Sequence, residues 1–589
     1  MSLRSRTRLM LFQPAGSGHS PASVRSRYFS AFDLFAFAII FAILALITHG
    51  TQQTLVPLAD MEQVPISLDP RALPEYALRT TLRMLAAIVA SLIFTFIYGA
   101  VAAKSRRAEM VLIPVLDILQ SVPVLGFLSF TVLFFMNLFP GRVLGVELAA
   151  VFAIFTSQAW NMTFSFYQSL KTLPRDLVEV SNSFRLTGWQ RFWRLEVPFS
   201  MPGLVWNTMM SMSGGWFFVV ASEAITVGDT TVTLPGVGAY VATAIDHRDL
   251  AAVAWSVMAM LVIILLYDQL LFRPLVAWAE KFRFEQSAGG PAPRSWVLEL
   301  AKRAHLFQRL IAPFGAMARL AARLPLRAPV RLPRSFEMAW ASVVMDRAWM
   351  VFVALSSVYG LWIIVAYVGR EVGLAEVFHV LGLGFITMIR VAVLIFLASL
   401  VWVPVGIWIG LRPKIATAVQ PAAQFLAAFP ANIVFPFAVV MIVRLQLDPN
   451  IWLSPLMILG TQWYILFNVI AGASAFPNDL KEAASSFQIR GWHWWTKVIL
   501  PGIFPYYVTG ALTASGGSWN ASIVAEVATW GTTTLRATGL GAYIGDATTA
   551  ADFPRVTLGI AVMSVFVIAF NRTIWRPMFQ FAARRLRLD

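Results

Sequence analysis

The sequence predicts an all-α polytopic membrane protein built from two parallel six-helix repeats, with about twelve transmembrane helices around a central pathway. The first observation is composition: of 589 residues, 58% are hydrophobic and only 13% are charged, with a mean hydropathy of +0.69. A soluble domain has about 25% charged residues, so most of this chain is expected to lie in lipid. The other two observations are a series of long apolar runs and a similarity between the two halves of the chain.

The apolar runs form two sets of six, and each run is long enough for a membrane helix of about 20 residues. Several runs contain proline, which a membrane helix tolerates when its neighbours satisfy the freed backbone groups. These prolines are Pro114, Pro123, Pro404, Pro421 and Pro430. The expected spans are 31–49, 80–103, 108–136, 146–170, 202–227 and 250–272 in the first half, and 348–369, 384–411, 417–443, 451–472, 505–529 and 556–575 in the second.

The positions of lysine and arginine predict the orientation of the chain. The loops between the expected spans alternate between the two sides of the membrane. Thirty-six of the 46 basic residues lie in the loops and termini of one side, and eight lie in the loops of the other side. This alternation is the positive-inside pattern, and it predicts cytoplasmic N and C termini in a bacterial-type inner membrane. Because topology accounts for the net charge of +16, we expect no nucleic-acid partner.

The longest segment between spans is basic and separates the two halves. Within it Trp296, Leu300 and Leu306 alternate with Lys302 and Arg303, which predicts an amphipathic helix on the inner leaflet with its basic residues toward anionic headgroups. An unstructured tether is the alternative. The expected domains are a basic N-terminal segment (1–30), a first six-span half (31–275), this linker (276–347), a second six-span half (348–578) and a basic tail (579–589).

The two halves match without a gap when the sequence is shifted by 303 residues. The shift pairs Glu179 with Glu482, for example, and a shift of 307 earlier in each half pairs Arg83 with Arg390. Each half has six expected spans and therefore begins and ends on the same side of the membrane. The repeats are then parallel and related by an axis along the membrane normal, an arrangement that suits a transport pathway.

A polar segment between the fourth and fifth expected spans of each half, at 174–192 and 477–495, is the main candidate site. Each segment is expected to form two short helices, with acidic residues in the first turn, where the helix dipole favours anions. The candidate residues are Asp176, Glu179, Phe184, Gly188, Trp189 and Pro198 in the first half, and Asp479, Glu482, Ala483, Ala484, Phe487, Gly491, Trp492 and Pro501 in the second.

The spacing within these segments predicts further detail. Gly188 and Gly491 are expected to make the turn between the two helices. Pro198 and Pro501 are expected to end the second helix before the chain enters the membrane. An apolar stripe is expected along the first helix of each pair, from Leu177, Val180 and Phe184 and from Leu480, Ala483 and Phe487.

The letters EAA at 482–484, followed by Gly491 and by VILP at 498–501, resemble the EAA signature of type-I ABC-transporter permeases. The chain looks like the form of this family in which both halves are fused in one polypeptide. Its sequence around the motif is similar to that of the nitrate/sulfonate/taurine/bicarbonate permease branch. The resemblance covers roughly residues 75–275 and 380–578. Six residues after the glutamate, where that family usually has glycine, this chain has Arg185 and Gln488.

The resemblance implies a function. The two polar segments would be coupling helices that dock two separate cytoplasmic ATPase subunits, which bind ATP and Mg²⁺. The chain would form the solute pathway of an ATP-driven importer and receive a small oxyanion from an extracytoplasmic solute-binding protein. The alternative for the polar segments is a pair of ordinary interfacial loops that match because the gene was duplicated.

Polar residues inside the expected spans are candidates for the pathway or its gate. Glu223 and Glu526 lie near the outer ends of the fifth spans, where a helix cap or an interhelix hydrogen bond is the alternative role. Arg83 and Arg390 would favour an anion at the outer mouth, or would anchor their helices at the interface. The remaining candidates are the small residues Ser213, Gly214, Ser515 and Gly517, which allow close helix approach, and Trp216 and Trp519, for which packing is the favoured role.

Several kinds of chemistry have no residues to support them in this sequence. There is no cysteine, no GxxxxGK[ST] phosphate loop and no HExxH pair, so we expect no catalytic, cofactor-binding or metal site on the chain. Two other classes remain open. A secondary transporter driven by an ion gradient would have acidic residues near mid-membrane, and a non-transporting membrane scaffold would not require matched polar segments.

Overall fold

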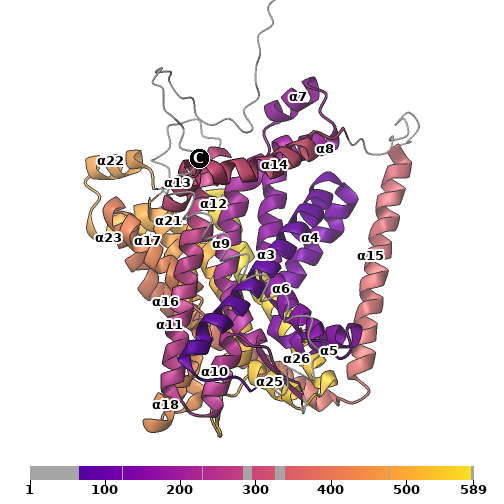
Figure 1. The fold of residues 1–589 in the computed structure, drawn as a ribbon, viewed down its shortest axis with the longest axis vertical. Coiled ribbons are helices and arrows are strands. Elements are labelled where there is room, and N and C mark those ends of the chain that lie inside the picture. The colour runs from indigo at the N-terminus through magenta and orange to yellow at the C-terminus, as the bar shows by residue number, and fades with distance from the viewer. Residues whose placement is uncertain are drawn as a thin grey trace, which may run out of the picture. The chain divides into compact units, whose positions relative to one another are not determined.

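The computed structural model describes residues 65–121, 124–227, 230–282, 295–325, 339–474 and 476–585. Within these ranges the chain is almost entirely helical (Figure 1). Seven of the described helices are long and apolar enough to cross a membrane, or up to eight if one bent pair counts as a single span. This confirms the all-α polytopic class. The expected segment 1–30 and span 31–49 lie outside the described residues, and the total of twelve spans stays a prediction.

The chain forms two compact units. Among the described residues, the smaller unit consists of those within 168–206 and 269–325, and the larger of those within 65–167, 207–268 and 339–585. The larger unit thus holds helices from both sequence repeats. The domain borders expected from the sequence stay a prediction, because this division follows spatial contacts rather than the repeat.

In its described part the first repeat begins with a short 3₁₀ turn and a long apolar helix, and it ends with another apolar helix. Asp69 caps the 3₁₀ turn by accepting a hydrogen bond from the backbone N–H of Arg71. Its elements in the larger unit, or shared with the smaller, are η1 (Pro70–Ala72), α3 (Leu73–Lys104), α4 (Arg106–Ser121), η2 (Val124–Phe127), α5 (Leu128–Leu138), α6 (Val143–Lys171), α9 (Val197–Ser222), β1 (Ala224–Val227), β2 (Thr230–Thr233), α10 (Val237–Asp246) and α11 (Leu250–Tyr267).

The second repeat has a similar order of elements, with three helices where the first repeat has the single helix α6. It starts with α15, which is exposed along most of its length, as expected of a helix that faces lipid. Its elements are α15 (Ala339–Val368), α16 (Leu374–Gly410), α17 (Pro413–Ala428), η6 (Ala431–Val434), α18 (Phe435–Arg444), α19 (Pro449–Trp452), α20 (Ser454–Leu459), α21 (Gln462–Ser474), α22 (Asn478–Ser486), α23 (Gly491–Trp494), η7 (Trp495–Ile499), α24 (Leu500–Ala525), β3 (Val527–Trp530), β4 (Thr533–Arg536), α25 (Leu540–Thr549), α26 (Phe553–Phe570), η8 (Asn571–Trp575) and α27 (Arg576–Arg585).

The third expected span of each half is not a continuous helix. The run 108–136 contains α4 and α5 joined by the 3₁₀ turn η2, and 417–443 contains α17 and α18 joined by η6. In the second half the break follows Pro430, whose backbone is extended and which has no N–H to continue a helix. Pro123, the equivalent proline, lies outside the described residues.

The fifth expected span of each half ends earlier than predicted. Helix α9 stops at Ser222 and α24 at Ala525, and a two-stranded antiparallel hairpin follows each of them. The hairpins pair Ala224 with Thr233 and Val527 with Arg536 at their open ends. These segments are rich in valine and threonine, which favour strands, so the expected span ends at 227 and 529 were placed too late.

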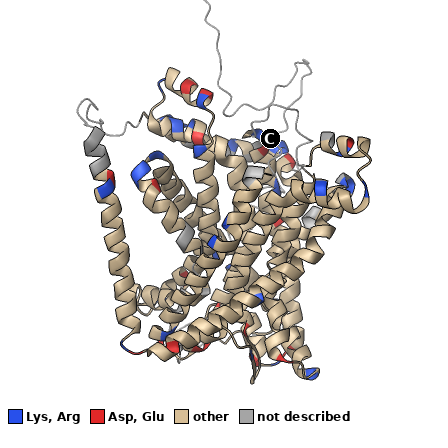
Figure 2. Ribbon diagram, turned by 180° about the vertical axis from the view of Figure 1, so that it is seen from behind, with Lys and Arg blue, Asp and Glu red and all other residues tan. Residues whose placement is uncertain are grey.

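Within the larger unit the two repeats interlock through equivalent elements. Helix α11 of the first repeat contacts α17, η6 and α18, and α26 of the second repeat contacts α4 and η2. The last span of each repeat therefore packs on the broken third span of the other. Charged residues lie mainly near the ends of the helices, with long uncharged stretches between them (Figure 2).

The smaller unit contains the polar segment of the first repeat and the linker helices. Ser295 caps the first linker helix by accepting a hydrogen bond from the backbone of Leu298. The linker expected to carry one amphipathic helix therefore carries two in its described part. The elements are α7 (Arg175–Ser183), α8 (Gly188–Arg191), η3 (Phe192–Glu196), η4 (Asp268–Phe272), α12 (Arg273–Ala279), η5 (Glu280–Phe282), α13 (Trp296–Arg303) and α14 (His305–Arg323).

Candidate functional site

The polar segment of each repeat forms two helices joined by a tight turn, as expected. In the first repeat these are α7 and α8, and in the second they are α22 and α23. Pro174 and Pro477 are the N-caps of α7 and α22. We call α7–α8 and α22–α23 the first and second helix pair.

The turn within each helix pair is made by a residue other than the expected glycine. Arg185 and Gln488 adopt the left-handed conformation, with φ of 50° and 54°. Leu186 then donates its N–H to the carbonyl of Ser181, at 3.1 Å, which closes a Schellman motif. Gly188 instead begins α8 and has no positive φ, whereas Gly491 has a φ of 60°.

This correction has a physical reason. A Schellman motif places its left-handed residue directly after the helix C-cap, and Arg185 and Gln488 hold that position after Phe184 and Phe487. The resembling family usually has glycine at this position, which is the residue that adopts a left-handed backbone without strain. Arg185 and Gln488 therefore make the left-handed turn although each carries a Cβ.

An exposed apolar stripe lies on the first helix of both pairs. Val180 and Phe184 are 49% and 58% exposed on the first pair, and Leu480 and Phe487 are 38% and 79% exposed on the second. Ala483 is exposed beside them, and Leu177 is only half-buried. Exposed phenylalanine at the same register in two repeats is typical of a surface that another protein covers.

The acidic residues of the helix pairs lie on exposed turns. Asp176, Glu179 and Glu482 are exposed, and Asp176 lies in the first turn of α7 as expected. Asp479 lies in the first turn of α22, but its side chain is outside the described part of the chain. Ala484 is 4% exposed and faces inward, so only part of the EAA sequence is on the surface.

Pro198 and Pro501 do not end a helix, contrary to the prediction. The chain continues from α23 through the π-helical turn η7 into α24, and Gly491–Ala525 counts as one span. The wider π turn lies immediately before the proline and accommodates the missing N–H. In the first repeat α8, η3 and α9 follow one another in the same way. The second helix of the second pair is therefore the end of a membrane span, and α8 continues into α9 in the same order.

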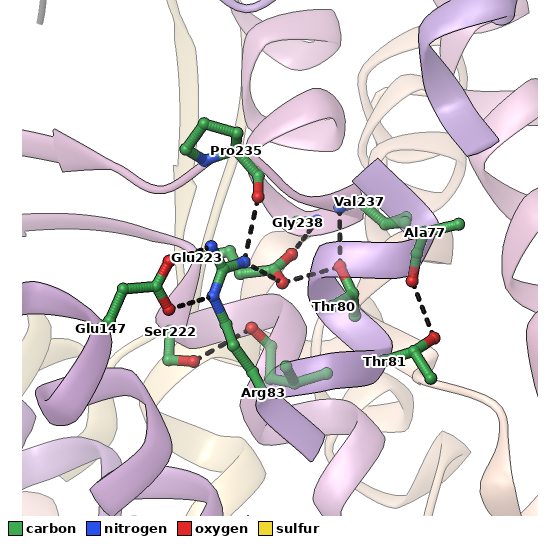
Figure 3. Close-up of polar contacts among 11 residues, drawn as sticks. Ala77, Thr80, Thr81, Arg83, Glu147, Ser222, Glu223, Pro235, Val237 and Gly238 are labelled. Atoms are coloured by element: carbon green, nitrogen blue, oxygen red, sulfur yellow. Dashed lines mark hydrogen bonds and ion pairs between the residues drawn. The ribbon is translucent and has the colours of Figure 1, made fainter. Parts of the chain in front are cut away.

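Arg83 lies in a buried network rather than at an exposed mouth or interface. Its guanidinium binds the Glu147 carboxylate through two hydrogen bonds of 2.7 Å and donates to Glu223 at 2.7 Å (Figure 3). Glu223 also accepts from the Thr80 hydroxyl and the Gly238 N–H, both at 2.7 Å. Arg83 is 4% exposed and Glu223 0%, so interhelix hydrogen bonding is the role this geometry favours.

The second repeat has the same network with one carboxylate fewer. Glu526 accepts from Thr387 at 2.9 Å, from Arg390 at 3.2 Å and from the Ala542 N–H at 3.0 Å. Beside Arg390, the place that Glu147 has beside Arg83 is taken by the Asn450 amide oxygen at 3.5 Å. The Arg390 side chain is 13% exposed, compared with 4% for Arg83.

Sequence reasoning missed several members of these networks. Thr80 and Thr387 are paired by the repeat, which was the signal that they have a common role. A Cβ on Gly236 or Gly539 would lie 2.3 Å from the carboxyl group of Glu223 or Glu526, so both positions require glycine. Glu147 has no equivalent carboxylate in the second repeat, so comparing the halves does not identify it.

The small residues of the fifth spans allow close helix packing. A Cβ on Gly517 would lie 2.5 Å from Thr461, and a Cβ on Gly214 would lie 3.3 Å from the Tyr464 hydroxyl. Ser213 and Ser515 are 8% and 3% exposed. Trp216 and Trp519 are each 1% exposed, which favours packing over contact with a solute.

Similarity to known proteins agrees with this architecture. The family described as "Binding-protein-dependent transport system inner membrane component" matches residues 95–273 and 402–574, one match in each repeat. The bicarbonate transport system permease protein CmpB of Synechococcus elongatus is 31% identical over 162 residues, which cover 27% of this chain and 55% of CmpB.

Other relatives are similar over comparable stretches. The nitrate import permease protein NrtB of Leptolyngbya laminosa is 27% identical over 185 residues, which cover 31% of this chain and 63% of NrtB. The glycine betaine/proline betaine permease ProW of Escherichia coli is 23% identical over 232 residues, covering 39% and 60%. The chain thus spans between half and two thirds of the length of these relatives. It belongs to the family of binding-protein-dependent transport system inner membrane components, with two copies of the family domain in one polypeptide.

Proposed function

We propose that this chain forms the whole transmembrane pathway of an ATP-driven importer and docks two ATPase subunits through its two helix pairs. ATP and Mg²⁺ would bind to those subunits and not to this chain. Both helix pairs and both termini would lie in the cytoplasm, as the distribution of basic residues in the sequence predicts. A solute-binding protein would deliver the solute from the other side of the membrane.

The observation that carries this proposal is the repeated exposed stripe. Phe184 and Phe487 are equivalent in the repeat and are 58% and 79% exposed, although large apolar side chains are usually covered. Two equivalent stripes on one chain fit two copies of the same partner. Family membership makes an ATPase subunit the partner that the stripes fit best.

The helices also support a way to transmit force. In the second repeat the docked helix α23 continues through η7 into the membrane span α24, all within Gly491–Ala525. A partner that moves the helix pair would therefore move the end of a membrane helix directly. Closure of two ATPase subunits on ATP binding would change the packing of both fifth spans and open the pathway to alternate sides.

For the solute we propose a small oxyanion. Two of the relatives are named as permeases for bicarbonate and nitrate, which are both small planar oxyanions. Another relative is named as a betaine permease, which makes betaine the alternative solute. The test is binding of candidate anions and betaines to the cognate solute-binding protein, and we expect saturable binding of an oxyanion and none of betaine.

Co-purification tests the docking proposal. Phe184→Asp together with Phe487→Asp should abolish recovery of the ATPase subunit with the detergent-extracted chain, because a carboxylate replaces an apolar contact at the centre of each stripe. The matched control is Asn182→Asp together with Ser485→Asp, which adds the same charge to the opposite face of the same helices. Loss of the subunit in both variants, or in neither, contradicts docking through the stripes.

A second experiment tests docking at the second helix pair through ATP hydrolysis. Glu482 is exposed on the second helix pair, so Glu482→Lys should leave the chain inserted in the membrane. We expect this charge reversal to abolish the ATP hydrolysis that the chain stimulates in its partner. Unchanged hydrolysis in membranes that contain the variant at normal levels would show that the ATPase does not bind at this helix.

A further inference from the structure

The linker helix α14 has an exposed apolar stripe of its own. Met317, Leu320 and Leu324 are 67%, 66% and 44% exposed, and Pro313 is exposed on the same side of the helix. The spacing of these four residues is four, three and four, so they form one continuous row along α14. Such a row on a helix at the surface requires a partner that covers apolar groups.

The charges beside this stripe indicate what that partner is. Arg309, Arg319 and Arg323 are exposed on α14 and lie on one side of the apolar row: Arg309 and Arg323 within about a quarter turn of its centre, and Arg319 about a third of a turn away. The helix sequence contains no acidic residue. An apolar row edged by arginine, with no carboxylate, is complementary to a bilayer surface that carries anionic headgroups.

The connections of α14 favour the same partner. The described span before the linker is Leu250–Phe282, and the described span after it is Met345–Val368. Both ends of the linker are therefore tied to membrane helices by short stretches of chain. Because both connections lead into membrane spans, α14 stays close to a bilayer surface and does not have to reach it by diffusion.

Helix α14 is also bonded to the first helix pair. The indole N–H of Trp189 donates to the carbonyl of Ala321 at 2.8 Å, and the amide of Gln190 donates to the carbonyl of Arg323 at 2.8 Å. Both carbonyls belong to the last turn of α14, and the Ala321 carbonyl also accepts the backbone N–H of Leu324 at 3.2 Å. Side chains of α8 therefore cap the C-terminus of α14.

The second helix pair has no equivalent support among the described residues. Trp492, the counterpart of Trp189, is 77% exposed. Helix α8 is closed by a capping box between Thr187 and Gln190, whereas Arg490 at the start of α23 makes no side-chain capping bond. The two repeats thus differ in the capping of the second helix of the pair and in the surroundings of its tryptophan.

We propose that α14 is a lipid-binding helix that lies on an anionic bilayer surface and holds the first helix pair in place through Trp189 and Gln190. The second helix pair is not held in this way. Anionic lipid would then order the first helix pair and leave the second unaffected. The proposal concerns lipid and does not depend on which protein docks on the helix pairs.

Amide hydrogen exchange on the full chain in nanodiscs tests this proposal. Peptides from 305–323 and 187–191 should exchange more slowly when phosphatidylglycerol is added to phosphatidylcholine, and peptides from 490–494 should not change. The variant with Arg309, Arg319 and Arg323 all replaced by Gln should lose this protection by phosphatidylglycerol. Three basic residues at an anionic surface change the equilibrium constant for membrane binding roughly a hundredfold. The control with Arg142, Arg370 and Arg444 replaced by Gln removes the same charge elsewhere and should keep the effect.

Measuring how deeply α14 lies in the bilayer tests the proposal without the arginine variant. The chain contains no cysteine, so Leu320→Cys provides a single site for a spin label. In nanodiscs with phosphatidylglycerol this label should be more accessible to oxygen than to a water-soluble nickel chelate, and a label at Gln308→Cys on the other side of α14 should show the reverse.

Three results would overturn the proposal. The first is exchange in 305–323 that does not respond to phosphatidylglycerol. The second is protection that appears only when an ATPase subunit is added, which would make α14 a protein-docking helix. The third is slower exchange in 305–323 with no change in 187–191, which would show that α14 binds lipid without holding the first helix pair.

Discussion

Arg83 and Arg390 are equivalent in sequence but differ in their surroundings. Arg83 binds two carboxylates and is 4% exposed, whereas Arg390 binds one carboxylate and a distant amide oxygen and is 13% exposed. Sequence comparison predicted the pair and its position near the ends of the second spans. It could not predict the difference, because the second carboxylate comes from Glu147, on a helix whose neighbours only the folded chain defines.

This difference predicts unequal effects of removing the two arginines. Arg83→Leu leaves two carboxylates without their cation in a buried site, which typically costs about 3–5 kcal/mol. Arg390→Leu leaves one, nearer to water, and should cost clearly less. The midpoint of thermal unfolding in detergent measures both, and an equal or larger loss for Arg390→Leu would contradict the described networks.

The left-handed turns at Arg185 and Gln488 are a second feature at the residue scale. A left-handed backbone costs roughly 1–2 kcal/mol for a residue with a Cβ, and glycine avoids this cost. Gln488→Gly should therefore stabilise the second helix pair by about 1 kcal/mol and slow amide exchange over 478–494. Ser485→Gly, in the helix three residues earlier, should destabilise it by about the same amount. Faster exchange in both variants would show that Gln488 is not left-handed in solution.

At the scale of elements, the sequence predicted where helices occur better than how they end. The helix pairs appear at the expected positions because their apolar spacing and capping residues act locally. The breaks at η2 and η6, the π turn before Pro501 and the hairpins after Ser222 and Ala525 were not predicted. Each depends on which backbone groups a neighbouring element satisfies, and hydropathy does not contain that information.

Close packing of α24 on the turn between α20 and α21, where Thr461 lies, gives a prediction with a control at the adjacent residue. A Cβ on Gly517 would lie 2.5 Å from Thr461, whereas a Cβ on Gly516 would meet nothing within 4 Å. Gly517→Ala should therefore destabilise the chain by about 1–3 kcal/mol through overpacking. Gly516→Ala should be neutral or slightly stabilising, because alanine favours a helix. Thermal unfolding in detergent compares them, and similar midpoints would contradict this packing.

At the scale of the whole molecule, the internal repeat was the most informative signal in the sequence. It predicted two six-helix halves of the same orientation, and the family match in each half agrees with it. It did not predict that equivalent helices of the two halves exchange partners, with α11 on η6 and α26 on η2. It also did not predict that the helix pairs differ, since the cap between α8 and α14 joins a repeated element to the linker, which has no second copy.

The proposed function is tested most directly by solute uptake. The chain is reconstituted in liposomes with its ATPase subunit and its solute-binding protein, and accumulation of labelled bicarbonate or nitrate is measured. Our account predicts uptake that requires ATP on the side of the ATPase and stops when Phe184 and Phe487 are replaced by Asp. Uptake that proceeds without nucleotide and follows an imposed ion gradient would contradict it.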